Sequence, residues 1–249
     1  MSAEFMLLVL GAGVAGFVQG MSGFAFGMVA MSFWVWGIEP GLAAVMSVFG
    51  GLTGQLLSAA TVRRGLHLKL LLPFLAGGVV GVPIGVWALP HLNPSHFKLA
   101  LGTMLLVCCP AMLLAPRLPP VTRGGRLGDA AAGAVGGLMG GIGGFTGVVP
   151  ALWCTLRGYD KDAHRAVLQN FNLAALAATM VALMLSGAVR SDMWPKFAVV
   201  APALILPSML GARVYLGLSP AAFRRLILCL LSLSGVAMMA AALVALFRP

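Results

Sequence analysis

The chain has 249 residues, of which 60% are hydrophobic and 9% are charged, and its formal net charge is +10. A soluble domain carries about 25% charged residues, so this composition excludes a water-soluble protein. The basic residues are scattered between apolar runs rather than gathered into a stripe. We therefore expect no nucleic-acid partner and attribute the excess positive charge to loops facing the cytoplasm.

Eight segments free of Asp, Glu, Lys and Arg follow one another along the chain. Because a membrane crossing takes about 20 apolar residues, they predict an all-α polytopic membrane protein embedded in a lipid bilayer. In chain order the segments are 5–37, 40–62, 70–97, 99–116, 130–156, 166–189, 197–212 and 226–247.

The first segment, 5–37, is too long for one straight helix across a bilayer. At 1.5 Å per residue it would extend about 50 Å, whereas the hydrocarbon core is about 30 Å thick. We predict a break in the glycine-rich stretch 20–27, because glycine frees the backbone for non-helical angles. The segment 130–156 has a counterpart at 140–147, followed by Pro150, which lacks an amide donor.

The two halves of the chain repeat each other. We assign residues 1–116 to a first transmembrane repeat, 117–127 to a cytoplasmic linker rich in Pro, Gly and Arg, and 128–249 to a second transmembrane repeat. The matches keep their order along three segments, so we interpret them as one duplicated unit. An offset of 121 pairs Gly16, Gly20, Gly23 and Phe24 with Gly137, Gly141, Gly144 and Phe145. An offset of 122 pairs Ala44, Val45 and Phe49 with Ala166, Val167 and Phe171. An offset of 126 pairs Gly85, Leu92, Pro94, Phe97 and Lys98 with Gly211, Leu218, Pro220, Phe223 and Arg224.

Each glycine-rich segment has two possible paths. It either crosses the membrane once as a broken helix, or enters, turns at the glycines and leaves by the same side as a re-entrant hairpin. Crossing divides Lys and Arg nine against seven between the two faces, whereas hairpins divide them twelve against four. The positive-inside rule favours the hairpins. Each repeat then has one hairpin and three transmembrane helices, so the repeats are inverted and both termini are extracytoplasmic.

The glycine breaks form the predicted binding site. Inverted repeats bring two such breaks together near the membrane midplane, where the N–H groups of half-helix N-termini attract an anion. We predict that this site binds a small anion and holds no cofactor or metal ion. The predicted substrate-binding residues are Gln19, Gly20, Ser22 and Gly23 at the first break, Gly141, Gly143, Gly144 and Thr146 at the second, and Gln169, Asn170 and Asn172 in the following segment.

The amides at 169, 170 and 172 form the densest amide cluster in any apolar run. Successive helical residues are rotated by about 100°, so Gln169 and Asn172 share a face, whereas Asn170 points toward a neighbouring helix. The cluster serves either substrate contact or hydrogen bonding between helices alone, and both interpretations stay open. Gln55 and Thr53 are weaker candidates in the first half.

Other motifs indicate structure rather than chemistry. The GxGxxG pattern at 11–16 lies in an uncharged run without a βαβ context, so we interpret it and the GxxxG pairs as helix-packing glycines. All six acidic residues lie at segment edges or in loops, which predicts no buried carboxylate and no proton relay. We interpret Arg213 as a snorkelling anchor. The chain lacks a nucleophile–His pair and metal-ligand spacing, so we predict no enzyme.

On these motifs the chain resembles the sulfite exporter TauE/SafE family of bacterial membrane transporters. The likeness rests on 137–145 with Pro150, on the weaker copy at 16–24, and on 210–213, 218–220 and 223–225. It implies a multi-pass protein of the bacterial inner membrane that transports sulfite, sulfoacetate or related organosulfonates. Many members carry Thr-Ser early in the segment after each hairpin, where this chain has Met46-Ser47 and Leu168-Gln169.

The sequence therefore predicts export of a small anion through a midplane site between two hairpins. With the cell interior negative, each exported negative charge gains about 2.3 kcal/mol per 100 mV, so efflux requires no coupling ion. The alternative is a non-transporting membrane scaffold or assembly factor, for which packing glycines suffice but paired breaks have no purpose. Self-association into a homo-oligomer stays open.

Overall fold

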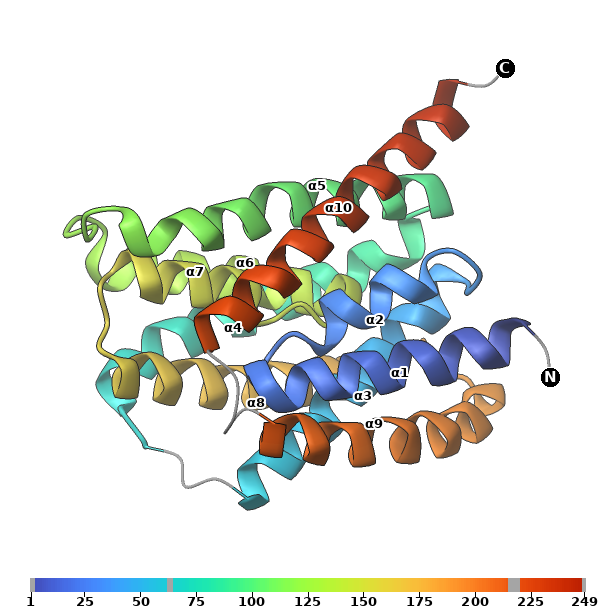
Figure 1. Cartoon of the computed structure of the whole chain (residues 1–249), viewed down its shortest axis with the longest axis horizontal. Coiled ribbons are helices and arrows are strands. Elements are labelled where there is room, and N and C mark those ends of the chain that lie inside the picture. The colour runs from blue at the N-terminus through green and yellow to red at the C-terminus, as the bar shows by residue number, and fades with distance from the viewer. Residues whose placement is uncertain (1–2, 62–64, 215–219, 248–249) are drawn as a thin grey trace.

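The computed structural model describes residues 3–61, 65–214 and 220–247. Within these ranges the chain forms helices joined by short connections (Figure 1). The first half contains α1 (Ala3–Ser22), α2 (Phe26–Trp34), α3 (Pro40–Thr61), α4 (Leu68–Ala88) and α5 (Pro94–Leu114), and the second contains α6 (Gly125–Gly143), α7 (Val148–Leu156), α8 (Lys161–Leu185), α9 (Trp194–Val214) and α10 (Pro220–Phe247). Short 3-10 helices lie at Leu89–His91, Ala115–Arg117 and Ser191–Met193.

Seven helical segments of the described chain are long and apolar enough to cross a membrane, which confirms the predicted all-α polytopic class. The sequence predicted eight hydrophobic segments. The difference arises in the segment 130–156, which forms α6 and α7. Neither qualifies as a span, because α7 has only 9 residues, and the 19 residues of α6 are rich in glycine and include Arg126 and Asp129.

Both glycine-rich segments break inside the predicted stretches. α1 ends at Ser22 and α2 begins at Phe26, whereas α6 ends at Gly143 and α7 begins at Val148. Gly23 and Gly144, which the repeat pairs with each other, follow the two long helices with φ angles of 83° and 78°. This left-handed conformation is the one that glycine adopts without a steric cost, and it ends a helix.

Each short helix folds back along the long helix before it. The Trp34 indole N–H near the end of α2 donates a hydrogen bond of 2.9 Å to the Leu7 carbonyl near the start of α1. Near the end of α7, the Trp153 indole N–H donates a hydrogen bond of 2.8 Å to the Asp129 carboxylate near the start of α6. Each glycine-rich segment is therefore a hairpin that begins and ends at the same end of the bundle.

The long helix of each hairpin packs on a helix of the other half: α1 lies along α9, and α6 lies along α4. Glycines allow the close approach, since a β-carbon on Gly20 would overlap the Ser208 carbonyl oxygen and one on Gly81 would overlap that of Ala134. These glycines are thus helix-packing residues, as predicted. α1 and α6 run in opposite directions (Figure 1), which is the geometry that an inverted repeat requires.

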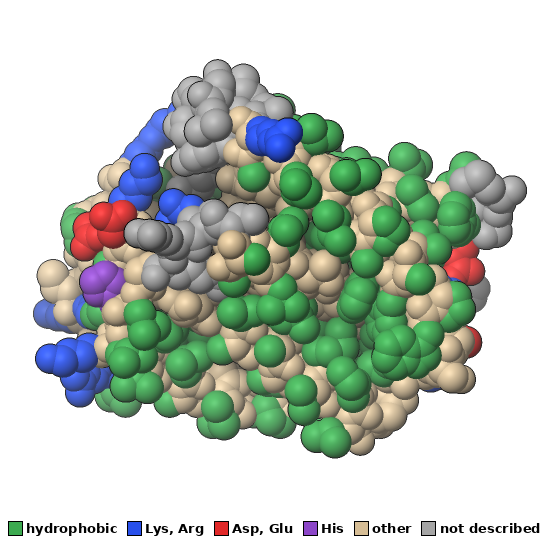
Figure 2. All heavy atoms as spheres, turned by 90° about the horizontal axis from the view of Figure 1, so that it is seen from below, with side chains coloured by type: hydrophobic (Ala, Val, Ile, Leu, Met, Phe, Trp, Pro, Cys, Tyr) green, Lys and Arg blue, Asp and Glu red, His purple; other side chains and the backbone are tan. Residues whose placement is uncertain are grey.

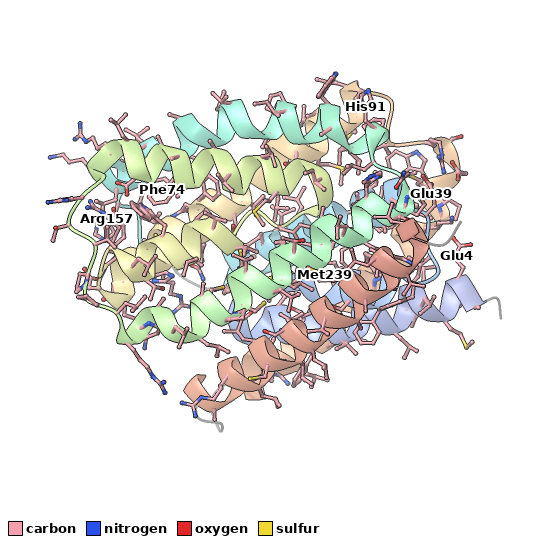
Figure 3. All side chains as sticks on the ribbon, turned by 90° about the horizontal axis from the view of Figure 1, so that it is seen from above. Glu4, Glu39, Phe74, His91, Arg157 and Met239 are labelled. Carbon is pink, nitrogen blue, oxygen red and sulfur yellow. The ribbon has the colours of Figure 1, made fainter. Side chains whose placement is uncertain are left out.

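Charged side chains gather at the two ends of the bundle. Figure 3 places Glu4, Glu39 and His91 at one end and Arg157 at the other. Figure 2 shows hydrophobic side chains over the middle of one face, with Lys and Arg gathered toward one end. We call the end with Glu4, Glu39, Arg190, Asp192 and Lys196 the paired end, and the end with Lys69, Arg157, Lys161, Arg165 and Arg213 the basic end.

Ion pairs join elements of both halves at the paired end. Lys196 Nζ on α9 lies 2.8 Å from Glu4 Oε1 on α1, and the Arg190 guanidinium lies 3.6 Å from the Glu39 carboxylate. The exposed tryptophans Trp36, Trp87 and Trp194 lie at the ends of helices there. Exposed indoles at helix ends are typical of the interface between a membrane and water.

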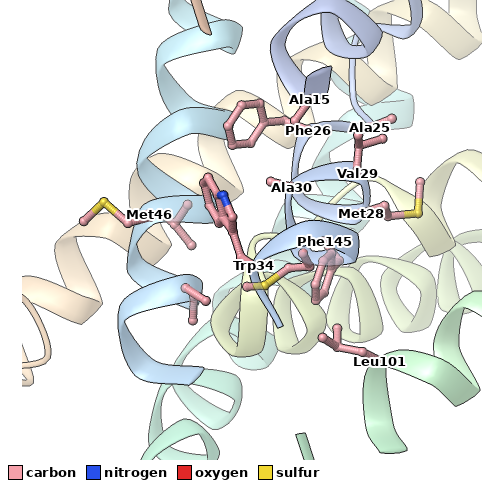
Figure 4. Close-up of a cluster of buried hydrophobic side chains, with 14 of the residues drawn as sticks. Ala15, Ala25, Phe26, Met28, Val29, Ala30, Trp34, Met46, Leu101 and Phe145 are labelled. Atoms are coloured by element: carbon pink, nitrogen blue, oxygen red, sulfur yellow. The ribbon is translucent and has the colours of Figure 1, made fainter. Parts of the chain in front are cut away.

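The short helix α2 lies in the protein core. Phe26, Met28, Met31 and Trp34 are at most 2% exposed, and Figure 4 shows Trp34 between elements of the first half and Phe145 of the second hairpin. A broken helix can lie at membrane depth only where other protein elements cover its backbone. The fold therefore places α2 where surrounding elements shield its backbone.

Candidate functional site

The connections between the short and long helices, residues 23–25 and 144–147, are here called the first tip and the second tip. They lie against each other. A β-carbon built on Gly27 would lie 3.0 Å from the Gly144 carbonyl oxygen, and one on Gly147 would lie 3.1 Å from the Cβ atom of Phe24. The two breaks thus meet inside the bundle, as the repeat predicts.

Side chains of α1 and α3 hold the first tip. The Gln19 amide donates a 3.2 Å hydrogen bond to the Gly51 carbonyl, and the Gln55 amide donates one of 2.6 Å to the Gly23 carbonyl. Gln19 is 4% exposed, and its Oε1 atom has no hydrogen-bond partner. Ser22 is exposed, and its hydroxyl oxygen accepts a 3.3 Å hydrogen bond from the Ala25 amide. Hydrogen bonds from Gln19 and Gln55 therefore hold one side of the first tip, whereas the side at Ser22 is exposed.

The second tip is closed. The Ser47 hydroxyl of α3 donates a 2.7 Å hydrogen bond to the Gly143 carbonyl, and the Thr146 hydroxyl donates one of 3.0 Å to Asn172 Oδ1 on α8. Residues 143–148 are all buried. The Asn172 Nδ2 group is buried beside Gly147 and has no hydrogen-bond partner.

The three amides of α8 diverge in the structure. The Asn170 amide donates hydrogen bonds of 3.0 Å to the Gly65 carbonyl and 2.8 Å to the Ala166 carbonyl. Its partners are therefore the connection between α3 and α4 and its own helix, rather than the neighbouring helix that we expected. Gln169 and Asn172 share a face of α8 but lie at different tips. Gln169 lines a cavity beside the first tip, whereas Asn172 accepts a hydrogen bond from the second tip.

That cavity has a volume of about 620 Å³ and extends from the first tip to the basic end. Its walls come from α1, the first tip, α3, α8, α9 and α10, with single residues of α2, α5 and α7. Of the eleven predicted site residues, five line it, namely Gln19, Gly20, Ser22, Gly23 and Gln169. The other six lie outside its lining, namely Gly141, Gly143, Gly144, Thr146, Asn170 and Asn172.

The charged groups that line this cavity are basic. Lys161, His164 and Arg165 come from α8 and Arg213 comes from α9, and no carboxylate is among the lining residues that the structure describes. In a cleft with apolar walls, charges of one sign raise the local concentration of the opposite ion. The cavity is therefore suited to an anion. Arg213 lines it, although we interpreted this residue as an anchor.

Sequence reasoning missed the basic residues of α8 because the helix begins earlier than its apolar run. The Asp160 carboxylate caps the helix, with Oδ1 accepting hydrogen bonds of 2.9 Å from the Ala163 amide and 3.0 Å from the Asp162 amide. These bonds, that from Ala163 foremost, lower the pKa of Asp160. Residues 161, 164, 165 and 168 then share one face. The sequence signal for these basic residues was Asp160 as an N-cap, followed by side chains at the three- and four-residue spacing of one helix face.

Asp129 corrects the expectation that no carboxylate is buried. It is 3% exposed and accepts hydrogen bonds of 2.8 Å from the Trp153 indole and 3.3 Å from the Tyr159 hydroxyl. Arg157 Nε lies 3.6 Å from the same carboxylate. The sequence places Asp129 at a segment edge, but α7 folds back over it. Its partners compensate for burial, and it holds the second hairpin closed, outside the cavity.

These features define a class of protein: a polytopic helical membrane protein whose two broken helices meet beside a basic cavity, an arrangement typical of secondary transporters. The sequence matches the family model described as Sulfite exporter TauE/SafE over residues 8–238. The chain therefore belongs to the TauE/SafE family and is a membrane transporter of sulfite or related anions. No curated protein and no solved structure matches it.

Proposed function

We propose that this protein exports a small anion, sulfite, sulfoacetate or a related organosulfonate, across the bacterial inner membrane. We further propose that the anion binds at the first tip, between Ser22 of α1 and Gln169 of α8. The observation that carries this proposal is the cavity itself, whose charged lining residues in the described chain are all basic. We place this site beside the first hairpin, near the midplane of the bilayer.

The groups around the first tip favour an anion over a cation. The Ser22 hydroxyl oxygen already accepts from a backbone amide, so its own proton is available to donate. The α2 N-terminus carries a partial positive charge beside it. Gln169 adds an amide to the same cavity. Lys161, Arg165 and the other bases draw the anion in from the basic end.

The state of the two tips fits a carrier that is open to one side. The cavity reaches the first tip from the basic end, whereas the second tip is buried. The positive-inside rule supports a cytoplasmic position for the basic end, and hence extracytoplasmic termini. Export then requires that the second tip and the paired end open while the first tip closes. The membrane potential favours this direction for an anion.

The test is the thermal stability of the purified full chain with and without sulfite, methanesulfonate or sulfoacetate. A specific ligand raises the melting temperature. Gln169→Ala should weaken anion binding about ten- to a hundredfold, because it removes a donor from a charged hydrogen bond. Asn170→Ala is the matched control, since Asn170 bonds to Gly65 outside the cavity, and it should keep the full anion effect.

Two results would contradict the proposal. The first is a wild-type melting temperature that no anion changes, which would favour the scaffold. The second is an anion effect that Gln169→Ala and Ser22→Ala both leave intact, which would remove the site from the first tip.

A further inference from the structure

We infer that a groove between α5 and the second hairpin binds an acyl chain of a phospholipid, which enters from the paired end. This groove lies apart from the cavity at the first tip and is here called the lateral groove. It has a volume of about 380 Å³. It is lined by Ala100, Leu101, Thr103, Met104, Val107 and Cys108 of α5 and by Val135, Met139, Ile142, Phe145 and Val149 of the second hairpin.

The lateral groove is apolar and opens on the outer face of the bundle. Apart from Thr103 and Cys108, its lining residues are purely hydrophobic, and none that the structure describes is charged. Val107 on one side and Val135 on the other are 62% and 44% exposed. Water does not fill an apolar space stably, and an anion would find no partner there. The occupant is therefore an apolar molecule of the bilayer.

The depth of the lateral groove matches the inner part of an acyl chain. Pro94 begins α5 at the paired end, and the groove extends along α5 from Ala100 to Cys108. At 1.5 Å per residue it lies about 9–21 Å from the start of the helix. Each half of the hydrocarbon core is about 15 Å thick. A chain that descends along α5 therefore reaches the groove with its terminal half.

The basic end of the lateral groove is closed, so the chain enters from the paired end. There α7 packs on both α5 and the 3-10 helix Ala115–Arg117. His96 is exposed and precedes Ala100, Thr103 and Val107 at the spacing of one helix face. Lys98, whose Nζ lies 5.2 Å from the ring centroid of Trp36, adds a positive charge at the same end. A phosphate headgroup at the paired end is thus complementary to these two side chains.

The surface of α6 favours an acyl chain over a helix of a second copy. Helices in membranes approach each other through small residues. The glycine face of α6 is already used by α4, since a β-carbon on Gly133 would overlap the Phe74 carbonyl oxygen. The face toward the lateral groove instead carries the bulky Val135, Met139 and Ile142. A flexible chain adapts to such an uneven wall and contacts both of its sides.

The inner end of the lateral groove reaches the second tip. Figure 4 shows Phe145 of the tip beside Leu101 of α5, and both line the groove. The repeat gives this place a counterpart in the first half, because the partners of five lining residues line the large cavity. They are Val18, Met21, Phe24, Met28 and Ile227, paired with Met139, Ile142, Phe145, Val149 and Leu101. An acyl chain therefore covers the second tip where the cavity opens beside the first.

The experiment cross-links the purified full chain in detergent to phosphatidylglycerol that carries a photoreactive diazirine midway along one long chain. The labelled residues are mapped by mass spectrometry. Ala100, Met104 and Val107 should be labelled about five- to tenfold more than their exposed counterparts on α10, Leu226, Leu230 and Leu233. Excess unlabelled long-chain phosphatidylglycerol should abolish the difference. Dihexanoyl phosphatidylglycerol, whose chains end before the groove, and glycerol phosphate should not.

Variants that fill the lateral groove place the chain inside it. Val107→Trp and Val135→Trp put a large ring into the groove from its two sides, and both positions are exposed, so the fold has room for the change. Each should reduce labelling of the groove to the level of α10. The matched control is Leu233→Trp, because Leu233 is the counterpart of Val107 at an offset of 126, is 67% exposed and lies outside the groove.

Four results would overturn the inference, and each leaves anion export standing. Equal labelling of α5 and α10 would mean that lipid surrounds the protein without occupying the groove. Labelling that survives both Val107→Trp and Val135→Trp would place the chain elsewhere. Competition by dihexanoyl phosphatidylglycerol would mean that the headgroup binds alone. Protection of the groove by cross-links between two copies of the chain would identify a second copy as the occupant.

Discussion

The two tips share a backbone but differ in what surrounds them. Gly23 and Gly144 have nearly the same φ angle, yet Ser22 before the first tip is exposed, whereas residues 143–148 around the second are all buried. At an offset of 122, Ser47 corresponds to Gln169. Ser47 bonds to the second hairpin at Gly143, whereas Gln169 lines the cavity beside the first tip. Two hairpins with the same backbone turn therefore have differently exposed tips, the first open to the cavity and the second buried.

The approaches to the two tips differ in charge. The same offset pairs Lys161 with Glu39 and Arg165 with Ala43. The charged lining residues that the structure describes at the basic end are thus all basic, whereas Glu39 at the paired end lies beside Arg190. The two halves thus share the hairpins and the packing glycines but differ in these charges.

The largest expected difference between the tips is their response to a methyl group. Gly144→Ala should destabilise the protein by about 2–5 kcal/mol, since it combines left-handed strain with overpacking against Ser47 and Val48. Gly23→Ala should cost about 1–2 kcal/mol, because only the strain applies and a β-carbon there meets nothing within 4 Å. Thermal unfolding of both variants checks this. Equal losses of stability would mean that the second tip is no more tightly packed than the first.

The next largest difference is expected in the stability lost when the contact that attaches each short helix to its long helix is removed. Asp129→Ala should destabilise by about 2–4 kcal/mol, because the Trp153 indole and the Tyr159 hydroxyl lose their shared acceptor and Arg157 loses its ion-pair partner. Trp34→Phe should cost about 1 kcal/mol, since it removes one hydrogen bond to Leu7 and keeps an aromatic ring. Denaturant unfolding of the two variants compares them. A greater loss in Trp34→Phe would contradict the role given to Asp129.

The smallest expected effect is on the capture of the anion. Lys161→Met and Arg165→Gln should raise the KM for anion export several-fold, more at low salt, with kcat little changed, because the bases act by attraction at a distance. Arg190→Gln at the paired end is the control and should leave KM unchanged. Transport into inverted membrane vesicles at two salt concentrations measures both. A KM that is independent of salt would remove the electrostatic role of the basic end.

The sequence was sufficient for features that depend on local chemistry. Glycine stretches predicted one break within 20–27 and one within 140–147, and GxxxG spacing predicted close helix packing, which the structure shows between α1 and α9 and between α4 and α6. The cavity could not be predicted from the sequence, because it depends on how α8, α9 and α10 pack together. The burial of Asp129 was likewise hidden, because α7 covers it only after the chain reverses.

The most direct test of the open first tip uses single cysteines at the two tips, in a chain whose 4 native cysteines are replaced by alanine. Ser22→Cys and Thr146→Cys are exposed to a charged thiol reagent in inverted membrane vesicles, with and without methanesulfonate. Ser22 is exposed in the cavity and Thr146 is 2% exposed. We expect that Ser22→Cys reacts and that the anion protects it, whereas Thr146→Cys does not react. Faster reaction of Thr146→Cys, or labelling of Ser22→Cys that the anion leaves unchanged, would contradict this expectation.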